Sequence, residues 1–287
     1  MGSASIQIHD VHVDYPVEGR GMRRILNGID LEIEKGEFVS VVGQTGCGKS
    51  TLLRLILGEE TPTRGRVLVD GWERHQPDPT CGYVPQKYSL FPDKTVLDNV
   101  TFGLEVTEFG PFSLLHSARR ERMRKFREEA VRYLRHTGLQ EADARKYPHQ
   151  LSGGMQQRVA IAQALIMKPP VLLMDEAFSA LDPGTRTGMQ RLIKELWRES
   201  GTTIVFVTHH TREAVCLATR IIALAKDSSG ELGSSVALDL SVPHLDFDSD
   251  EETIRCLIRE VESATLPRAG SARSDHTGVQ LTKHVLS

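Results

Sequence analysis

The chain has 287 residues, of which 39% are hydrophobic, a size and composition that suit one α/β domain with a helical insertion. Its net charge of -3 and pI near 6.4 carry no nucleic-acid signature, and its four scattered cysteines lack disulfide or C-x-x-C spacing, which favours a reducing cytoplasm. No apolar stretch is long enough to span a bilayer and no signal peptide opens the chain, so we expect that it does not enter a membrane by itself.

Residues 5–35 read as an antiparallel β region with a loop at 17–21. The apolar run 38–42 predicts a buried strand, and residues 51–57 predict the helix after it. The loop between them fits G-x-x-x-x-G-K-[ST], the pattern that cradles nucleotide phosphates. Its members are Gly43, Gln44, Thr45, Gly46, Cys47, Gly48, Lys49 and Ser50, and Thr51 follows them.

This loop has the chemistry that a phosphate site requires. Its glycines let the backbone approach a phosphate where a Cβ would clash, and the free N–H groups of a helix N-terminus favour an anion. Lys49 is expected to reach the β- and γ-phosphates, and the Ser50 hydroxyl to bind Mg²⁺. We assign all nine residues, including Thr51, to nucleotide binding.

The middle of the chain predicts helices. Residues 65–71 read as a strand and turn, and the helical pattern runs from about 89 to 164, with a long charged helix at 117–137. Arginines cluster at 119–127 with glutamates among them, which fits a solvated helix face or a contact with a membrane surface or partner. The aromatic segment 103–116 fits either a contact surface or ordinary packing of a longer insertion.

Two further motifs follow in order. Residues 151–158 read Leu-Ser-Gly-Gly-Met-Gln-Gln-Arg just before an apolar helix, again pairing flexible glycines with a helix N-terminus. The apolar run 171–174 predicts a strand buried on both faces, and it ends in Asp175 and Glu176. Ligands bind at the carboxyl ends of such strands. Asp175 is therefore expected to hold Mg²⁺, and Glu176 to polarise the attacking water as general base.

The last third returns to parallel-strand chemistry. A helix is expected at 185–200 after Pro183, a strand at 203–207, a domain edge at 227–230, a strand at 236–243 and a helix at 250–265. The expected organisation is an ATPase domain at 1–235 with its helical subdomain at about 89–164, a C-terminal extension at 236–265, and a disordered tail at 266–287.

Taken together, the motifs resemble the ATP-binding subunits of ABC transporters over roughly residues 5–226. The resemblance implies an α/β fold: a P-loop NTPase core of the ABC-ATPase type with an N-terminal antiparallel β region and an inserted helical subdomain. It implies ATP hydrolysis with ATP and Mg²⁺, and a head-to-tail dimer. The signature residues Ser152, Gly153, Gly154 and Gln156 would then act in trans, on the γ-phosphate held by the partner's P-loop.

The resemblance also suggests roles for single residues. Tyr15 would stack on adenine. Gln86 would sense Mg²⁺ and the γ-phosphate and couple them to a membrane partner. Together with Ser50 and Asp175, it is expected to bind the metal ion. Asp182 would lie in the loop that crosses the dimer interface, and His209 would contact the γ-phosphate and hold Glu176 and the water in register. Two positions depart from the family pattern, Gln163 and Ala177, and neither removes a catalytic group.

The expected function is the cytoplasmic ATPase subunit of an importer, most like the nitrate/sulfonate/taurine group. It would lie on the cytoplasmic face of the inner membrane with an integral-membrane permease, a second copy of the same chain, and a solute-binding protein that acts through the permease. An ATPase of a lipid-trafficking or export system is the main alternative. A soluble ABC-type ATPase of translation or DNA repair and a simple P-loop kinase are further alternatives. Such soluble ATPases usually have two ATPase halves or a long coiled-coil or zinc insertion, and the chain has neither.

Overall fold

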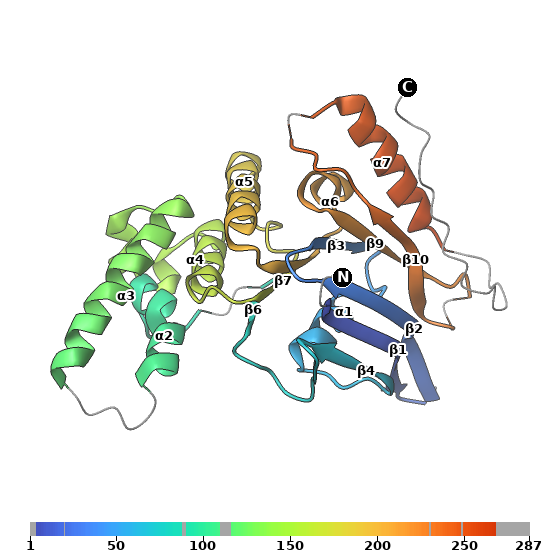
Figure 1. Cartoon of the computed structure of the whole chain (residues 1–287), viewed down its shortest axis with the longest axis horizontal. Helices are drawn as coiled ribbons and strands as arrows, with labels where there is room; N and C mark the ends of the chain where they lie inside the picture. Colours follow the sequence, from blue (N-terminus) through green and yellow to red (C-terminus); the bar gives the residue numbers. More distant parts are fainter. Residues whose placement is uncertain are drawn as a thin grey trace.

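One sheet runs through the molecule. The computed structural model describes residues 4–19, 21–87, 90–109, 116–229, 231–247 and 249–267. Its strands there are β1 (Ala4–Val17), β2 (Gly21–Glu34), β3 (Phe38–Gly43), β4 (Arg64–Val69), β5 (Trp72–Glu73), β6 (Cys81–Val84), β7 (Val171–Asp175), β8 (Thr203–Val207), β9 (Arg220–Lys226) and β10 (Ser234–Ser241). They are hydrogen-bonded in the order β5-β4-β1-β2-β10-β9-β3-β8-β7-β6 (Figure 1).

The strands from β9 to β6 form the parallel half of the sheet. Every residue of β7 and β8 is buried, because successive side chains point into two different cores. Leu173 and Val205 pack in the core that includes α1 (Lys49–Leu57). Leu172 and Ile204 pack in the opposite core, with α5 (Pro183–Ser200) and α6 (Thr211–Leu217). The strands predicted from these apolar runs are confirmed.

The strands β1, β2, β4 and β5 form the antiparallel half, as predicted for the N-terminal region. The β1–β2 pair has register shifts, two of them on either side of Val11. Such bulges bend a strand and re-aim its side chains. Beyond them the register brings Tyr15 opposite Arg23, at the end of the pair that faces α1.

A separate group of helices stands at one side of the sheet (Figure 1). It contains α2 (Val96–Phe109), α3 (His116–His136), two 3-10 turns (Glu141–Arg145 and Pro148–Gln150) and α4 (Gly153–Ile166). These helices share their own apolar core, which includes Val100, Leu134 and Val159. The sequence contains an aromatic segment at 103–116. Its residues 103–109 continue α2, while residues 110–115 lie outside the described part of the chain.

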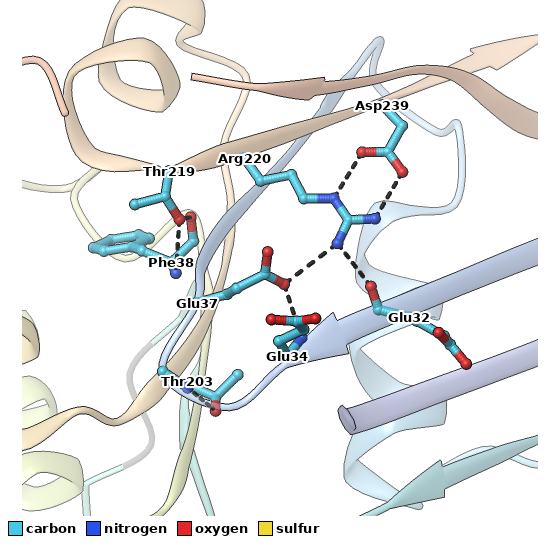
Figure 2. A network of polar contacts seen from close by, with 9 residues as sticks. Glu32, Glu34, Glu37, Phe38, Thr203, Thr219, Arg220 and Asp239 are labelled. Atoms are coloured by element: carbon cyan, nitrogen blue, oxygen red, sulfur yellow. Dashed lines mark hydrogen bonds and ion pairs between the residues drawn. The ribbon is translucent and has the colours of Figure 1, made fainter. Parts of the chain in front are cut away.

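The strand β10 joins the two halves of the sheet. It pairs antiparallel with β9 and parallel with β2. Figure 2 shows how Arg220 secures this junction: its guanidinium donates to both carboxylate oxygens of Asp239 at 2.7 Å and to the backbone oxygen of Glu32 at 2.7 Å. The hydrogen bonds to Asp239 raise the pKa of Arg220, Glu37 adds to this effect, and burial opposes it. The boundary expected between residues 235 and 236 falls inside β10, which belongs to the same sheet as β3 and β7.

The helix α7 (Glu251–Ala264) lies on α6, beside the parallel half (Figure 1). Its first residue, Glu251, accepts two hydrogen bonds from Arg212 at 2.8 and 2.9 Å. The buried ammonium of Lys194 donates to the backbone oxygen of Cys216 at 2.6 Å and lies 3.0 Å from Asp246. The described helices include none that is long and apolar enough to cross a membrane. Of the tail expected at 266–287, residues 268–287 lie outside the described part.

Candidate functional site

The loop between β3 and α1 has a backbone that only glycine can adopt at two positions. Gly43 and Gly48 have φ angles of 155° and 92°. A Cβ on Gly43 would lie 2.5 Å from the backbone oxygen of Leu224, and one on Gly48 would lie 2.5 Å from a methyl group of Leu26. Both contacts are too short for real atoms, so the loop keeps its tight curl around the start of α1.

Two lysines brace this loop. Lys49 is 6% exposed, and its ammonium donates to the backbone oxygens of Gly43 at 2.8 Å and Gln44 at 3.2 Å. Lys226, at the end of β9, donates to the backbone oxygen of Thr45 at 3.1 Å. The loop therefore places one buried and one more exposed positive charge beside the N–H groups of the α1 N-terminus, a combination that attracts polyanions.

Three polar side chains meet where three neighbouring parallel strands end. Gln86 follows β6, Glu176 follows β7, and His209 follows β8. Gln86 Nε2 donates to Glu176 Oε2 at 2.7 Å, and His209 Nδ1 lies 3.2 Å from Glu176 Oε1. Glu176 has a φ of 45°, unusual for a residue other than glycine, and its N–H donates to the backbone oxygen of Val207 at 2.9 Å. The carboxylate is thus fixed between an amide and an imidazole.

Asp175 lies beside this group, in surroundings suited to a cation. It is 4% exposed, and burial raises the pKa of its carboxyl, an effect that a hydrogen bond with Ser50 opposes. Its Oδ1 is buried and has no hydrogen-bond partner among the described residues. An orphaned buried carboxylate oxygen next to a hydroxyl fits Mg²⁺, which proteins hold through one or two carboxylates with phosphates and water. The described residues contain no cluster of three or more His, Cys, Asp or Glu side chains that could hold a metal ion by themselves.

A cavity of about 350 Å³ connects these features. Its walls are formed by Tyr15, Arg23, Ile25, Thr45, Gly46, Gly48, Lys49, Ser50, Thr51, Gln86 and Glu176. The predicted residues Gly43, Gln44 and Cys47 shape the loop without lining the cavity, and Cys47 is a buried thiol whose pKa is raised by burial. Arg23 and Ile25 were missed by the sequence analysis. No signal in the sequence pointed to them, because the register that sets Arg23 opposite Tyr15 depends on β-bulges.

Tyr15, another residue of the cavity wall, is held in place by a hydrogen bond. Its hydroxyl donates to a carboxylate oxygen of Glu60, whose other oxygen lies 3.5 Å from Arg54 Nε. Burial, aided by the hydrogen bond to Glu60, raises the pKa of Tyr15, so the phenol stays protonated at neutral pH. The ring is therefore fixed in position and neutral, which suits a flat stacking surface.

The remaining predicted residues lie outside this cavity. Ser152 is the N-cap of α4 and accepts a hydrogen bond from the N–H of Met155 at 3.3 Å. Asp182 is the N-cap of α5 and accepts one from the N–H of Thr185 at 3.0 Å. Both are exposed, as is Gly153, whereas Gly154 and Gln156 are half-buried. The chain thus carries two separate helix N-termini suited to anions, one in the cavity and one at the surface.

Comparison with known proteins identifies the fold. The family model described as "ABC transporter" matches residues 26–179, which include the phosphate loop, the segment at 151–158 and the carboxylates of Asp175 and Glu176 at the end of β7. The chain belongs to the ABC transporter family. It is 43% identical over 77% of its length to an ABC transporter ATP-binding protein of Methanocaldococcus jannaschii, and covers 77% of that relative.

Other relatives of this ABC chain carry import names. It is 40% identical, over 85% of its length and 88% of the relative's, to an aliphatic sulfonates import ATP-binding protein of Zymomonas mobilis. It is 38% identical, over 84% of its length, to a nitrate import ATP-binding protein of Synechococcus elongatus, of which it spans 35%. Among solved structures, a dimeric ATP-binding cassette in a post-hydrolysis state bound to ADP and Pi matches with a TM-score of 0.71 and 34% identity. That match covers 83% of this chain and 99% of the cassette.

These matches establish the core chemistry of the ABC chain. It is an ATP-binding domain homologous to ATP-hydrolysing cassettes, and its α/β fold with an antiparallel region and inserted helices is the predicted one. The observed geometry fits that activity: the phosphate loop and the fixed Glu176 line one cavity, and the lone buried carboxylate oxygen of Asp175 lies next to the loop residue Ser50.

Proposed function

We propose that this chain is the ATP-binding subunit of an importer, and that it hydrolyses ATP in a head-to-tail pair to drive a separate permease. The observation that carries the proposal is the meeting of Gln86, Glu176 and His209 beside the phosphate loop. The import names of several relatives support the direction of transport.

The hydrolytic step follows from this geometry. With ATP in the cavity, Lys49 and the α1 N-terminus would hold the β- and γ-phosphates. Glu176 would take a proton from a water molecule as that water attacks the γ-phosphorus and the bond to ADP breaks. His209 and Gln86 would hold the carboxylate in line. Ser50, Asp175 and Gln86 are the residues proposed to hold Mg²⁺, which would screen the phosphate charges when bound.

The exposed N-terminus of α4 supports the paired arrangement. A helix N-terminus with two glycines and a capping serine is suited to phosphate, yet in this chain it lies outside the nucleotide cavity. Placed against a second copy, it would supply the missing side of the partner's site. Two such contacts, related by a two-fold axis, form a closed dimer. The matching cassette structure is itself described as a dimer.

The proposed location is the cytoplasmic face of the membrane, reached by binding a permease. Relatives named for nitrate, bicarbonate and aliphatic sulfonates point to a small oxyanion as the cargo. The cargo would be selected by the permease and a solute-binding protein, because the cavity described here is the one that takes the nucleotide.

A pull-down tests the proposal. Tagged Glu176→Gln protein with MgATP, added to detergent-solubilised membranes of the native cell, should recover a polytopic permease, as read by mass spectrometry. A matched Lys49→Ala bait should recover less, because it should bind nucleotide poorly. A permease together with a solute-binding protein would support import, whereas a permease alone would favour the export or lipid-trafficking alternative. Recovery of soluble partners alone would overturn the transporter assignment.

Replacing Tyr15 should weaken ATP binding. A base stacked on an aromatic ring gains roughly 1–3 kcal/mol, so Tyr15→Ala should raise the ATP Kd by about 5- to 150-fold. Tyr15→Phe keeps the ring but loses the hydrogen bond to Glu60, so its effect should be smaller. Equilibrium binding of ATP to each variant measures this difference. Equal Kd values for wild type and Tyr15→Ala would remove Tyr15 from the base site.

A further inference from the structure

A buried carboxylate lies behind the loop that carries His209. Glu213, in α6, is 8% exposed, and its oxygens accept hydrogen bonds from Thr208 Oγ1 at 2.8 Å and from Gln190 Nε2 at 2.9 Å. A charge taken out of water is tolerated when its oxygens are satisfied in this way. Glu213 does not line the nucleotide cavity, so the reaction proposed above does not use it.

The Thr208 hydroxyl links this carboxylate to the position of His209. Thr208 is 1% exposed, and its Oγ1, which donates to Glu213, also accepts a hydrogen bond from the N–H of His210 at 3.0 Å. His209 lies between Thr208 and His210 in the chain, and the hydrogen bonds of both neighbours lead to Glu213. The buried carboxylate therefore helps to position His209. A movement of Glu213 would alter the 3.2 Å separation between His209 Nδ1 and Glu176 Oε1.

Arg186 faces the same carboxylate from α5. Its Nε lies 4.0 Å from Glu213 Oε1, too far for a hydrogen bond, and this buried nitrogen has no hydrogen-bond partner among the described residues. Its Nη2 donates to the backbone oxygen of Leu181 at 3.0 Å. Leaving a buried donor unpaired is unfavourable, so a small movement that closed the gap would be favoured.

The segment 179–182, which Arg186 holds through Leu181, is well placed to sense a second copy. Ala180 and Asp182 are exposed on either side of the buried Leu181. The segment also touches the N-terminus of α4, because a Cβ on Gly154 would lie 3.4 Å from the backbone oxygen of Ala180. A partner chain that docks on α4 would therefore press on this segment as well.

We infer that Arg186 and Glu213 are positioning residues that couple dimer contact at 179–182 to the placement of His209. When the segment moves, Arg186 Nε closes on Glu213 Oε1 and holds in place the carboxylate that already accepts a hydrogen bond from Thr208, so that His209 keeps its position beside Glu176. The inference rests on the proposed head-to-tail dimer. It adds that Arg186 and Glu213, which do not line the nucleotide cavity, are needed for full turnover by the dimer.

Steady-state kinetics of the full chain test this relay. Arg186→Gln and Glu213→Gln should each lower kcat by about tenfold, as supporting residues around a reactive group typically do, while the ATP Kd stays unchanged because neither residue lines the cavity. Because the two residues act through one contact, the double variant should also fall by about tenfold rather than a hundredfold. Glu195→Gln makes the same change from carboxylate to amide at an exposed position on α5. It is the matched control and should keep the wild-type kcat.

The outcomes separate the relay from simpler roles. Independent losses that multiply in the double variant would overturn the inference, as would wild-type kcat in Arg186→Gln. Parallel losses of kcat, ATP binding and thermal stability would show a purely structural role and would also overturn it. If wild-type protein hydrolysed no ATP, the proposed function would fail together with the inference. Wild-type turnover with unaffected variants would remove the inference alone.

Discussion

Glu176→Gln protein is expected to bind MgATP and to lose turnover. The amide keeps the shape of the carboxylate but cannot accept a proton from the attacking water. Removing a general base typically costs about 10²–10⁴-fold in rate. The partners Gln86 and His209 remain in place, so the nucleotide site should keep its form. Phosphate release measures the rate, and size exclusion with MgATP should show the variant accumulating as a dimer.

The control for this result is Glu199→Gln, which makes the same chemical change at an exposed position on α5 and should turn over ATP like wild type. Appreciable turnover by Glu176→Gln would remove Glu176 as the base. A variant that neither hydrolyses nor binds ATP would show instead that Glu176 supports the fold of the cavity. ATP binding must therefore be measured, because Glu176 has a positive φ and a substitution there could disturb the backbone.

Ser152→Arg is expected to abolish hydrolysis while leaving ATP binding by the single chain intact. The large cation would replace the N-cap of α4 and block the approach of this helix end to the partner's nucleotide. Losing a preorganised donor set at a developing charge costs about 10²–10³-fold in kcat. The serine lies outside the nucleotide cavity of its own chain, so the ATP Kd of the monomer should stay the same. ATP titration and phosphate release measure the two quantities.

Ser235→Arg, at an exposed position on β10, is the matched control and should hydrolyse ATP normally. Loss of ATP binding in monomeric Ser152→Arg would contradict the head-to-tail arrangement. Full hydrolysis by Ser152→Arg would show that the end of α4 does not approach a nucleotide at all.

The elements that the sequence predicted best are those whose signal is local. The apolar runs of β7 and β8 are buried on both faces, so they contain no polar alternation to obscure them. The phosphate loop is contiguous, and Gly43, Gly46 and Gly48 each have a positive φ that favours glycine at that position. The helix expected at 185–200 is also confirmed: α5 begins at Pro183, whose fixed φ suits the first turn, and it ends before Gly201, which adopts the left-handed conformation of a C-cap.

The parts that the sequence analysis missed depend on contacts between distant segments. Arg23 enters the cavity through a cross-strand register that bulges shift, and no periodic pattern records such shifts. Tyr15 is held by Glu60, 45 residues away, and Glu213 is held by Gln190, 23 residues away. The place of β10 between β9 and β2 likewise depends on long-range pairing, so its sequence predicted a strand but not the sheet it joins.

The position of β10 has a consequence for how the protein is made. The wall of the nucleotide cavity that holds Tyr15 belongs to the antiparallel half of the sheet, and the phosphate loop belongs to the parallel half. The backbone hydrogen bonds between the two halves run through β10, which is the last of the described strands in chain order. A ribosome must therefore synthesise the chain to Ser241 before this backbone pairing can form, and until then the two walls are joined by the apolar core that they share.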